Sequence, residues 1–177
     1  MEVDIKSVIE AILFSAGESV PIDRIAMGAE CSREDAEKAC EELMSKLNFS
    51  RRGIRIIKLG DNYQMVSAAE YAANIRTALE TRKPPALTQT ALEVLAIVAY
   101  QQPVTKAYIE QVRGVDSSYT VGSLVEKGLI CEAGRLDVPG RPILYATTED
   151  FLRVFGISEL SELPELPELK NGTGENT

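Results

Sequence analysis

The apolar positions of the first fifty residues recur at spacings of three and four, the period of helices that bury one face. One stripe occupies residues 5–16 and stops at Gly17, and a shorter one at 22–29 follows Pro21, which a helix tolerates in its first turn. A third stripe follows Ser32, a residue type that caps helix N-termini. The pattern predicts three helices, the third burying Ala36, Ala39, Cys40, Leu43 and Leu47.

The period then changes from that of a helix to that of a strand. Residues 53–59 and 63–66 are rich in β-formers and are separated by the turn residues 60–62, which predicts a β-hairpin. Three short helices followed by a hairpin is the element order of a winged helix, in which the hairpin, or wing, covers the open side of the helical core. A further helix near 69–80 leads to Pro84-Pro85, where the first domain is expected to end.

The second half repeats this order. Thr88 or Thr90 is expected to cap a helix, Thr105 a second helix that ends at Gly114, and Ser117 a third that ends at Gly128. Two β-rich runs, 129–131 and 143–147, flank the turn-rich residues 138–142 and predict a second wing. When the sequence is aligned with itself at an offset of 84 residues, Val20 matches Val104 and Ile25 matches Ile109. This weak internal similarity supports a repeated architecture.

The chain is therefore expected to be an α+β protein, mostly helical, built from two tandem winged-helix domains at residues 1–83 and 84–157. Residues 158–177 form an acidic tail with leucine at every third position from Leu160 to Leu169. Composition favours a solvated, flexible tail. The alternative is a polyproline II edge of leucines that docks on the body or on a partner.

Composition argues against an enzyme. The chain has no histidine, the commonest general base and metal ligand, and no P-loop, dinucleotide-binding, nucleophile-elbow or zinc-protease motif. The three cysteines, Cys31, Cys40 and Cys131, lack zinc-site spacing and are expected to be small buried residues. We expect no catalytic residue, cofactor, metal or small-molecule substrate. No apolar run is long enough to cross a bilayer and the N-terminus lacks the features of a secretion signal, so a cytoplasmic protein is expected.

The charge balance argues against tight duplex binding, although a winged-helix transcription regulator remains the alternative. Residues 1–83 carry 12 basic and 14 acidic groups and residues 84–156 carry six and eight, so neither domain has surplus positive charge for phosphate. The densest basic cluster, Arg51, Arg52, Arg55 and Lys58, lies on and just before the first wing. It could touch DNA backbone, but is more typical of a solvated hairpin edge. At most weak, non-specific DNA contact is expected.

Four strings together resemble segregation and condensation protein B. They are IEAILFSAGE at 9–18, ALEVLAIVAYQQPVT at 91–105, IEQVRGV at 109–115 and GRPILY at 140–145. The resemblance implies a homodimeric, non-catalytic subunit of the bacterial SMC condensin complex, acting in chromosome condensation and segregation during the cell cycle and associated with the nucleoid. In that family two copies hold one kleisin subunit, which bridges the SMC ATPase heads. The first domain is the main dimerisation unit and the second contributes much of the grip on kleisin.

The candidate partner-binding residues lie in the second domain. Tyr100, Gln101, Gln102 and Pro103 close its first helix, where an aromatic ring and two amides can form a binding lip, although the spacing of Tyr100 also suits a core residue. The other candidates are Arg113, for which a surface ion pair with Asp116 is an alternative, Tyr119 at the start of the third helix, and Arg141 in the wing turn.

The domain boundary generates a first prediction. Because Pro84-Pro85 separates two helical sets that each have their own wing, a fragment of residues 1–83 should fold and dimerise alone. Circular dichroism and sedimentation of the fragment measure both properties. An unfolded fragment would show that the boundary is misplaced.

Overall fold

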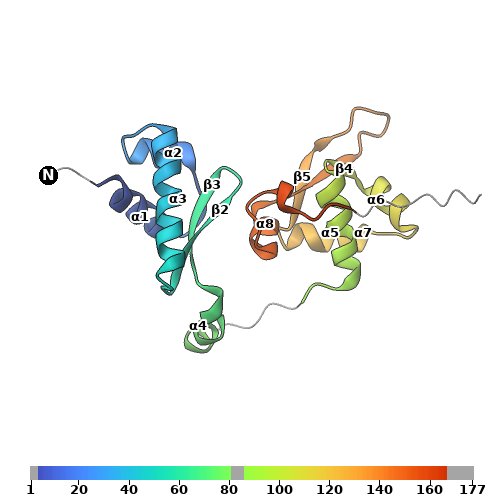
Figure 1. Cartoon of the computed structure of the whole chain (residues 1–177). Helices are drawn as coiled ribbons and strands as arrows, with labels where there is room; N and C mark the ends of the chain where they lie inside the picture. Colours follow the sequence, from blue (N-terminus) through green and yellow to red (C-terminus); the bar gives the residue numbers. More distant parts are fainter. Residues whose placement is uncertain (1–3, 81–85, 167–177) are drawn as a thin grey trace, which may run out of the picture.

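The computed structural model describes residues 4–80 and 86–166 and confirms a mostly helical α+β chain with two winged-helix units (Figure 1). The first unit begins with α1 (Ile5–Ala16), α2 (Ile22–Gly28) and α3 (Arg33–Phe49). The caps are those that the sequence predicts: Ser32 Oγ accepts a hydrogen bond from the Asp35 amide at 3.1 Å, and α1 ends at Gly17 with a left-handed φ of 67°.

A hairpin closes this first helical set. Strands β2 (Ile54–Leu59) and β3 (Asn62–Ser67) pair antiparallel around Gly60 and Asp61, and the short β1 (Val20–Pro21) pairs with the other edge of β3. Ile56 and Tyr63 of the hairpin are fully buried against the helices. All five residues predicted for the buried stripe of α3 are buried: Ala36, Ala39, Cys40, Leu43 and Leu47.

The second unit has the same order. It contains α5 (Gln89–Gln101), β4 (Val104–Thr105), α6 (Lys106–Arg113), α7 (Ser118–Glu126), β5 (Ile130–Arg135) and β6 (Ile143–Thr147), with β6 in the middle of its sheet. The residues that match in the sequence at an offset of 84 also occupy equivalent positions in the two units. Val20 and Val104 each open the first strand of their unit, and Ile25 and Ile109 are each the fully buried fourth residue of the second helix.

Four helices or helical turns lie outside the two winged helices, three of them before the tail. The 3-10 turn η1 (Ala69–Tyr71) leads into α4 (Ala72–Leu79), which has no buried residue and lies apart from both cores in Figure 1. The predicted boundary at Pro84-Pro85 falls outside the described residues. Helix α8 (Glu149–Phe155), which the sequence analysis missed, follows the second wing and buries Phe151 and Leu152 in the second core.

The beginning of the tail differs from the expected solvated segment. The 3-10 turn η2 (Leu160–Glu162) places Leu160 against the second core, and Leu163 packs there as well. The Tyr100 hydroxyl donates a hydrogen bond to the Pro164 carbonyl at 2.5 Å. Leucine side chains bury apolar area when they dock, which outweighs the acidic composition for these residues. The expectation for residues 167–177 lies outside the described part of the chain.

The two units are in contact through β2, because one face of this strand packs in the first core and the other face packs against the second core. Ile54 and Ile56 point to the first core, whereas Ile57 and Leu59, on the opposite face of the strand, pack against the second. Leu59 is only 2% exposed. An apolar residue on both faces of a strand means that both faces are covered, and here the second cover is the other domain.

Polar contacts complete this junction. The Gly60 amide donates to the Ser158 carbonyl at 2.7 Å. The Glu149 carboxylate, in the first turn of α8, accepts from the Ser19 hydroxyl at 2.5 Å and from the Asn62 side-chain amide. The junction therefore joins the wing of the first unit to α8 and the segment that follows it.

The cysteines are not all buried, which corrects one expectation. Cys40 is fully buried, and its burial raises the thiol pKa to about 11. Cys31 is half-buried and Cys131 is exposed, because Cys131 lies on β5, the edge strand of the second sheet. Across residues 4–80 and 86–166, no helix combines the length and apolar character that a membrane crossing requires.

The junction generates a second prediction. Leu59 belongs to the first unit but its side chain is buried in the core of the second. Leu59→Ala should therefore lower the free energy of unfolding of the full chain by about 2–4 kcal/mol. Urea titration followed by circular dichroism measures the loss. Val154→Ala is the control, because Val154 on α8 is exposed and its loss should change the midpoint little. Equal midpoints for the two variants would show that Leu59 contributes nothing to stability.

Candidate partner-binding surface

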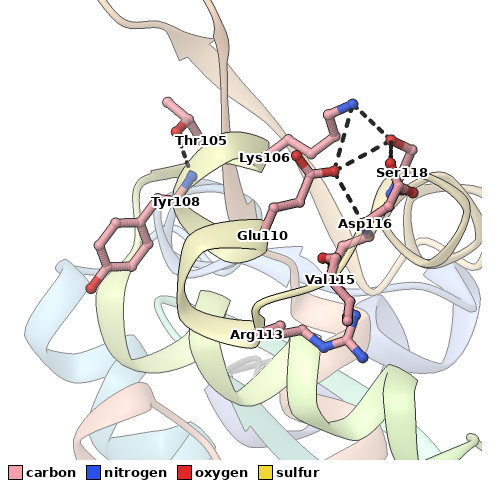
Figure 2. A network of polar contacts seen from close by, with 9 residues as sticks. Thr105, Lys106, Tyr108, Glu110, Arg113, Val115, Asp116 and Ser118 are labelled. Carbon is pink, nitrogen blue, oxygen red and sulfur yellow. Dashed lines mark hydrogen bonds and ion pairs between the residues drawn. The ribbon is translucent and has the colours of Figure 1, made fainter.

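The helix-turn-helix of the second unit, α6 and α7, is organised by a polar network around its turn (Figure 2). Thr105 Oγ1 caps α6 by accepting from the Tyr108 amide at 3.2 Å, and Gly114 ends the helix with a left-handed φ of 72°. The Asp116 carboxylate accepts from the Ser118 amide at 3.0 Å and so caps the first turn of α7. The turn therefore begins at the left-handed Gly114 and ends where the Asp116 carboxylate caps α7.

Glu110 links the two helices directly. One of its carboxylate oxygens accepts from the Ser117 amide at 3.1 Å and the Ser118 hydroxyl at 3.4 Å, and lies 3.8 Å from the Lys106 ammonium. Lys106 in turn donates to the Ser118 hydroxyl at 2.7 Å. Because this network satisfies its charged groups internally, it fixes the relative position of α6 and α7.

Arg113 belongs to the interior of this arrangement rather than to its surface. Its side chain is only 11% exposed. The guanidinium donates to the Ser117 hydroxyl at 2.7 Å and to one Glu93 carboxylate oxygen at 3.3 and 3.4 Å, which ties the turn to α5. The alternative of a surface ion pair with Asp116 is wrong. Asp116 is engaged by Ser118, whereas Glu93, twenty residues earlier in the chain, holds the arginine.

Two of the four predicted binding residues at 100–103, Tyr100 and Gln102, form hydrogen bonds within the chain. Tyr100 contacts the beginning of the tail, as described above, and the Gln102 side-chain oxygen accepts from the amide of Thr147 at 2.7 Å and from its hydroxyl at 3.1 Å. Gln102 therefore anchors the end of β6 to the end of α5. Only Gln101 and Pro103 of the lip are exposed.

Tyr119 and Arg141 are exposed, but on different elements. Tyr119, in the first turn of α7, is 88% exposed. Arg141 lies in the wing turn with a φ of 38°, and its carbonyl accepts from the Arg135 guanidinium at 3.1 Å. The structure thus separates the predicted residues into an internal group, Tyr100, Gln102 and Arg113, and an outward-facing group, Gln101, Pro103, Tyr119 and Arg141.

Sequence reasoning missed a groove between α7 and the wing. It has a volume of about 460 Å³. Its lining residues are Lys106, Ala107, Ser118, Val121, Gly122, Pro142, Ile143 and Tyr145. Gly122 inside the predicted third helix was the one local signal for it, because a glycine weakens a helix relative to alanine.

The comparisons with known proteins identify the family. A family model described as segregation and condensation complex subunit ScpB matches residues 7–166. The chain belongs to this family. Segregation and condensation protein B of Ruminiclostridium cellulolyticum is 46% identical over 156 residues, which cover 88% of this chain and 82% of that protein.

Two crystal structures of ScpB proteins are also similar. ScpB from Mycobacterium tuberculosis is 32% identical, with 89% of this chain and 99% of that chain covered and a TM-score of 0.43. A dimer of the ScpB N-terminal domain complexed with ScpA peptide is 30% identical, with 41% of this chain and 91% of that chain covered and a TM-score of 0.40. The sequence match establishes membership of the ScpB family.

Of the two helices that would enter a DNA groove in a winged-helix regulator, neither carries an excess of positive charge in this ScpB-family chain, and α3 has more acidic than basic side chains. On α3, the Arg33 guanidinium holds three carboxylates, those of Asp23 at 3.1 Å, Glu37 at 3.2 Å and Asp61 at 3.2 Å. Helix α7 carries one charged residue, Glu126. In the basic cluster of the first wing, Arg55 pairs with Glu70 at 3.1 Å. These faces offer little to neutralise phosphate.

Within the described ranges, no group of three or more cysteine, aspartate or glutamate side chains is placed to hold a metal ion.

The Arg113 bridge generates a third prediction. Arg113→Ala leaves Glu93 and Ser117 without their partner at a largely buried position, so the free energy of unfolding should fall by about 1–3 kcal/mol. Urea titration of the full chain measures the change. Lys127→Ala is the matched control, because Lys127 is exposed and its ammonium donates to the Ser123 hydroxyl at the helix surface. If both variants unfold at the wild-type midpoint, the bridge is not stabilising.

Proposed function

We propose that the chain is a non-catalytic accessory subunit of a bacterial SMC condensin complex, which binds the kleisin subunit as a homodimer and acts in chromosome condensation and segregation. The observation that carries this proposal is the family match, which spans nearly the whole chain. The chain would reach SMC through the kleisin and would work in the cytoplasm at the nucleoid. Its role is architectural, since it would join proteins rather than transform a substrate.

Exposed apolar side chains support a protein-binding role. Phe14, Phe49 and Met27 of the first unit and Tyr119 and Val112 of the second are more than half exposed. Large apolar side chains exposed to this degree are available for burial against another protein. The weak availability of positive charge on α3 and α7 favours polypeptide over duplex DNA as the ligand.

The first unit, within residues 1–83, is proposed as the main dimerisation unit. Helix α4 supports this assignment, because an eight-residue helix is only marginally stable without packing and α4 buries no residue against its own chain. A twofold partner could cover it, together with exposed residues such as Phe14 and Phe49.

The second unit, within residues 84–157, is proposed to contribute to kleisin binding. Gln101, Pro103, Tyr119 and Arg141 face outward and would contact the partner. Tyr100, Gln102 and Arg113 would act indirectly, because their contacts with Pro164, Thr147 and Glu93 hold the shape of that surface.

A binding experiment tests the proposal. Size-exclusion chromatography with light scattering should give the mass of a dimer for the chain alone and a stable complex with the purified kleisin from the same genome. A parallel gel shift with genomic DNA fragments at moderate salt should show only weak binding without sequence preference. A monomer that ignores the kleisin, or tight and sequence-dependent duplex binding, would contradict the proposed function.

A further inference from the structure

The groove between α7 and the second wing is lined mainly by apolar atoms. Val121 forms its buried floor, and Ala107, Pro142, Ile143 and Tyr145 form its sides. Its volume of about 460 Å³ lies within the range of sites that bind small ligands or anchoring side chains. An apolar lining gains free energy when it is covered by another apolar surface, and it gains nothing from a phosphate.

Gly122 keeps the groove open. It lies within α7, where a glycine costs about 0.5–1 kcal/mol relative to alanine. A Cβ atom placed on Gly122 would meet no atom within 4 Å, so no neighbour within the chain requires a glycine at this position. The missing side chain leaves space that only an external group could use.

The groove is also preformed. One wall is fixed by the hydrogen bond from Lys106 to Ser118 and by the Glu110 network that holds α6 to α7. The other wall is β6, which is paired on both sides, since Tyr145 lies opposite Val104 of β4 and Ile143 lies opposite Arg135 of β5. A rigid groove loses little conformational entropy when it is filled.

Two arginines are neighbours of lining residues of the groove, one in the chain and one across the sheet. Arg141 adjoins the lining residue Pro142, and Arg135 lies opposite the lining residue Ile143. Neither forms an ion pair with a carboxylate in residues 4–80 or 86–166, although Glu132 and Asp137 lie on the same wing. An arginine at the edge of an apolar groove suits a ligand carboxylate, which it can bind in a bidentate manner.

We propose that this groove binds a short kleisin segment that inserts an apolar side chain over Gly122 and places a neighbouring aspartate or glutamate at Arg141. The assignment rests on the proposed function, because it names the part of the partner that the second domain recognises. The groove lies on the face with which a DNA-binding winged helix would contact a duplex, but its floor is apolar and not cationic.

The decisive variant is Gly122→Leu, which fills the groove from within. Because its Cβ meets no atom of the chain, the variant should fold with a wild-type circular dichroism spectrum, while the dissociation constant for kleisin rises at least about tenfold, as expected for loss of a buried apolar anchor. Gly122→Ala is the matched control. It should bind kleisin within about twofold of wild type and melt at the same or a higher temperature, since alanine is the better helix former.

A charge variant tests the second half of the proposal without changing the groove. Arg141→Glu should weaken kleisin binding by about fivefold or more, with a larger effect at low salt, whereas Lys127→Glu, an equal charge change on the exposed end of α7, should not. This pair also decides the question if Gly122→Leu fails to fold.

A photo-crosslinker identifies the bound segment directly. p-Benzoylphenylalanine incorporated at Ala107, on the exposed side of the groove, should crosslink to a kleisin peptide in which an apolar residue stands next to an acidic one. A crosslink to a basic segment would overturn the proposal.

The outcomes separate this proposal from the proposed function. If the wild type binds kleisin and both Gly122→Leu and Arg141→Glu bind it equally well, the groove assignment is wrong while the proposed function stands. If the wild type does not bind kleisin, the proposed function itself fails. Loss of duplex binding in Gly122→Leu with kleisin binding intact would overturn the groove assignment in favour of a nucleic-acid face.

Discussion

In each half of the chain the three helices leave one side of their core open, and a β-hairpin covers that side. In the first half this cover is supplied by Ile56 and Tyr63, both fully buried. In the second half the hairpin starts at the buried Ile130 and is tied to α5 through Gln102 and Thr147. The positions of the helix-turn-helix, the groove and the junction between the halves all depend on this closure.

Much of the fold could be predicted because its signals are local. Helix periodicity identified the buried stripe of α3, and the side chains of Ser32 and Thr105 identified two helix starts by the hydrogen bonds that they accept. Helix α8 was missed, because a seven-residue helix directly after a strand gives too few turns for a period to be recognised. The docking of Leu160 and Leu163 on the body was only the alternative in the sequence analysis, because acidic composition favours solvation and the contact with the second core is not visible in the sequence.

The candidate site was harder to predict because its contacts join residues that are distant in sequence. Arg113 reaches Glu93 and Tyr100 reaches Pro164, and no spacing rule connects either pair. The groove is assembled from α6, α7 and β6, so no single segment contains its pattern. Tyr119 and Arg141, which the sequence analysis named among the candidate partner-binding residues, are both exposed in the structure, and their role in binding stays a prediction.

Leu59 makes the two halves of the chain dependent on each other. Without the second half, Leu59 would lie exposed on the first wing, and without the first half, the second core would lack one of its buried side chains. The same arrangement limits how the sequence can drift. A residue that replaces Leu59 must fit the core of the other half of the chain. The two halves therefore cannot be exchanged independently between related proteins.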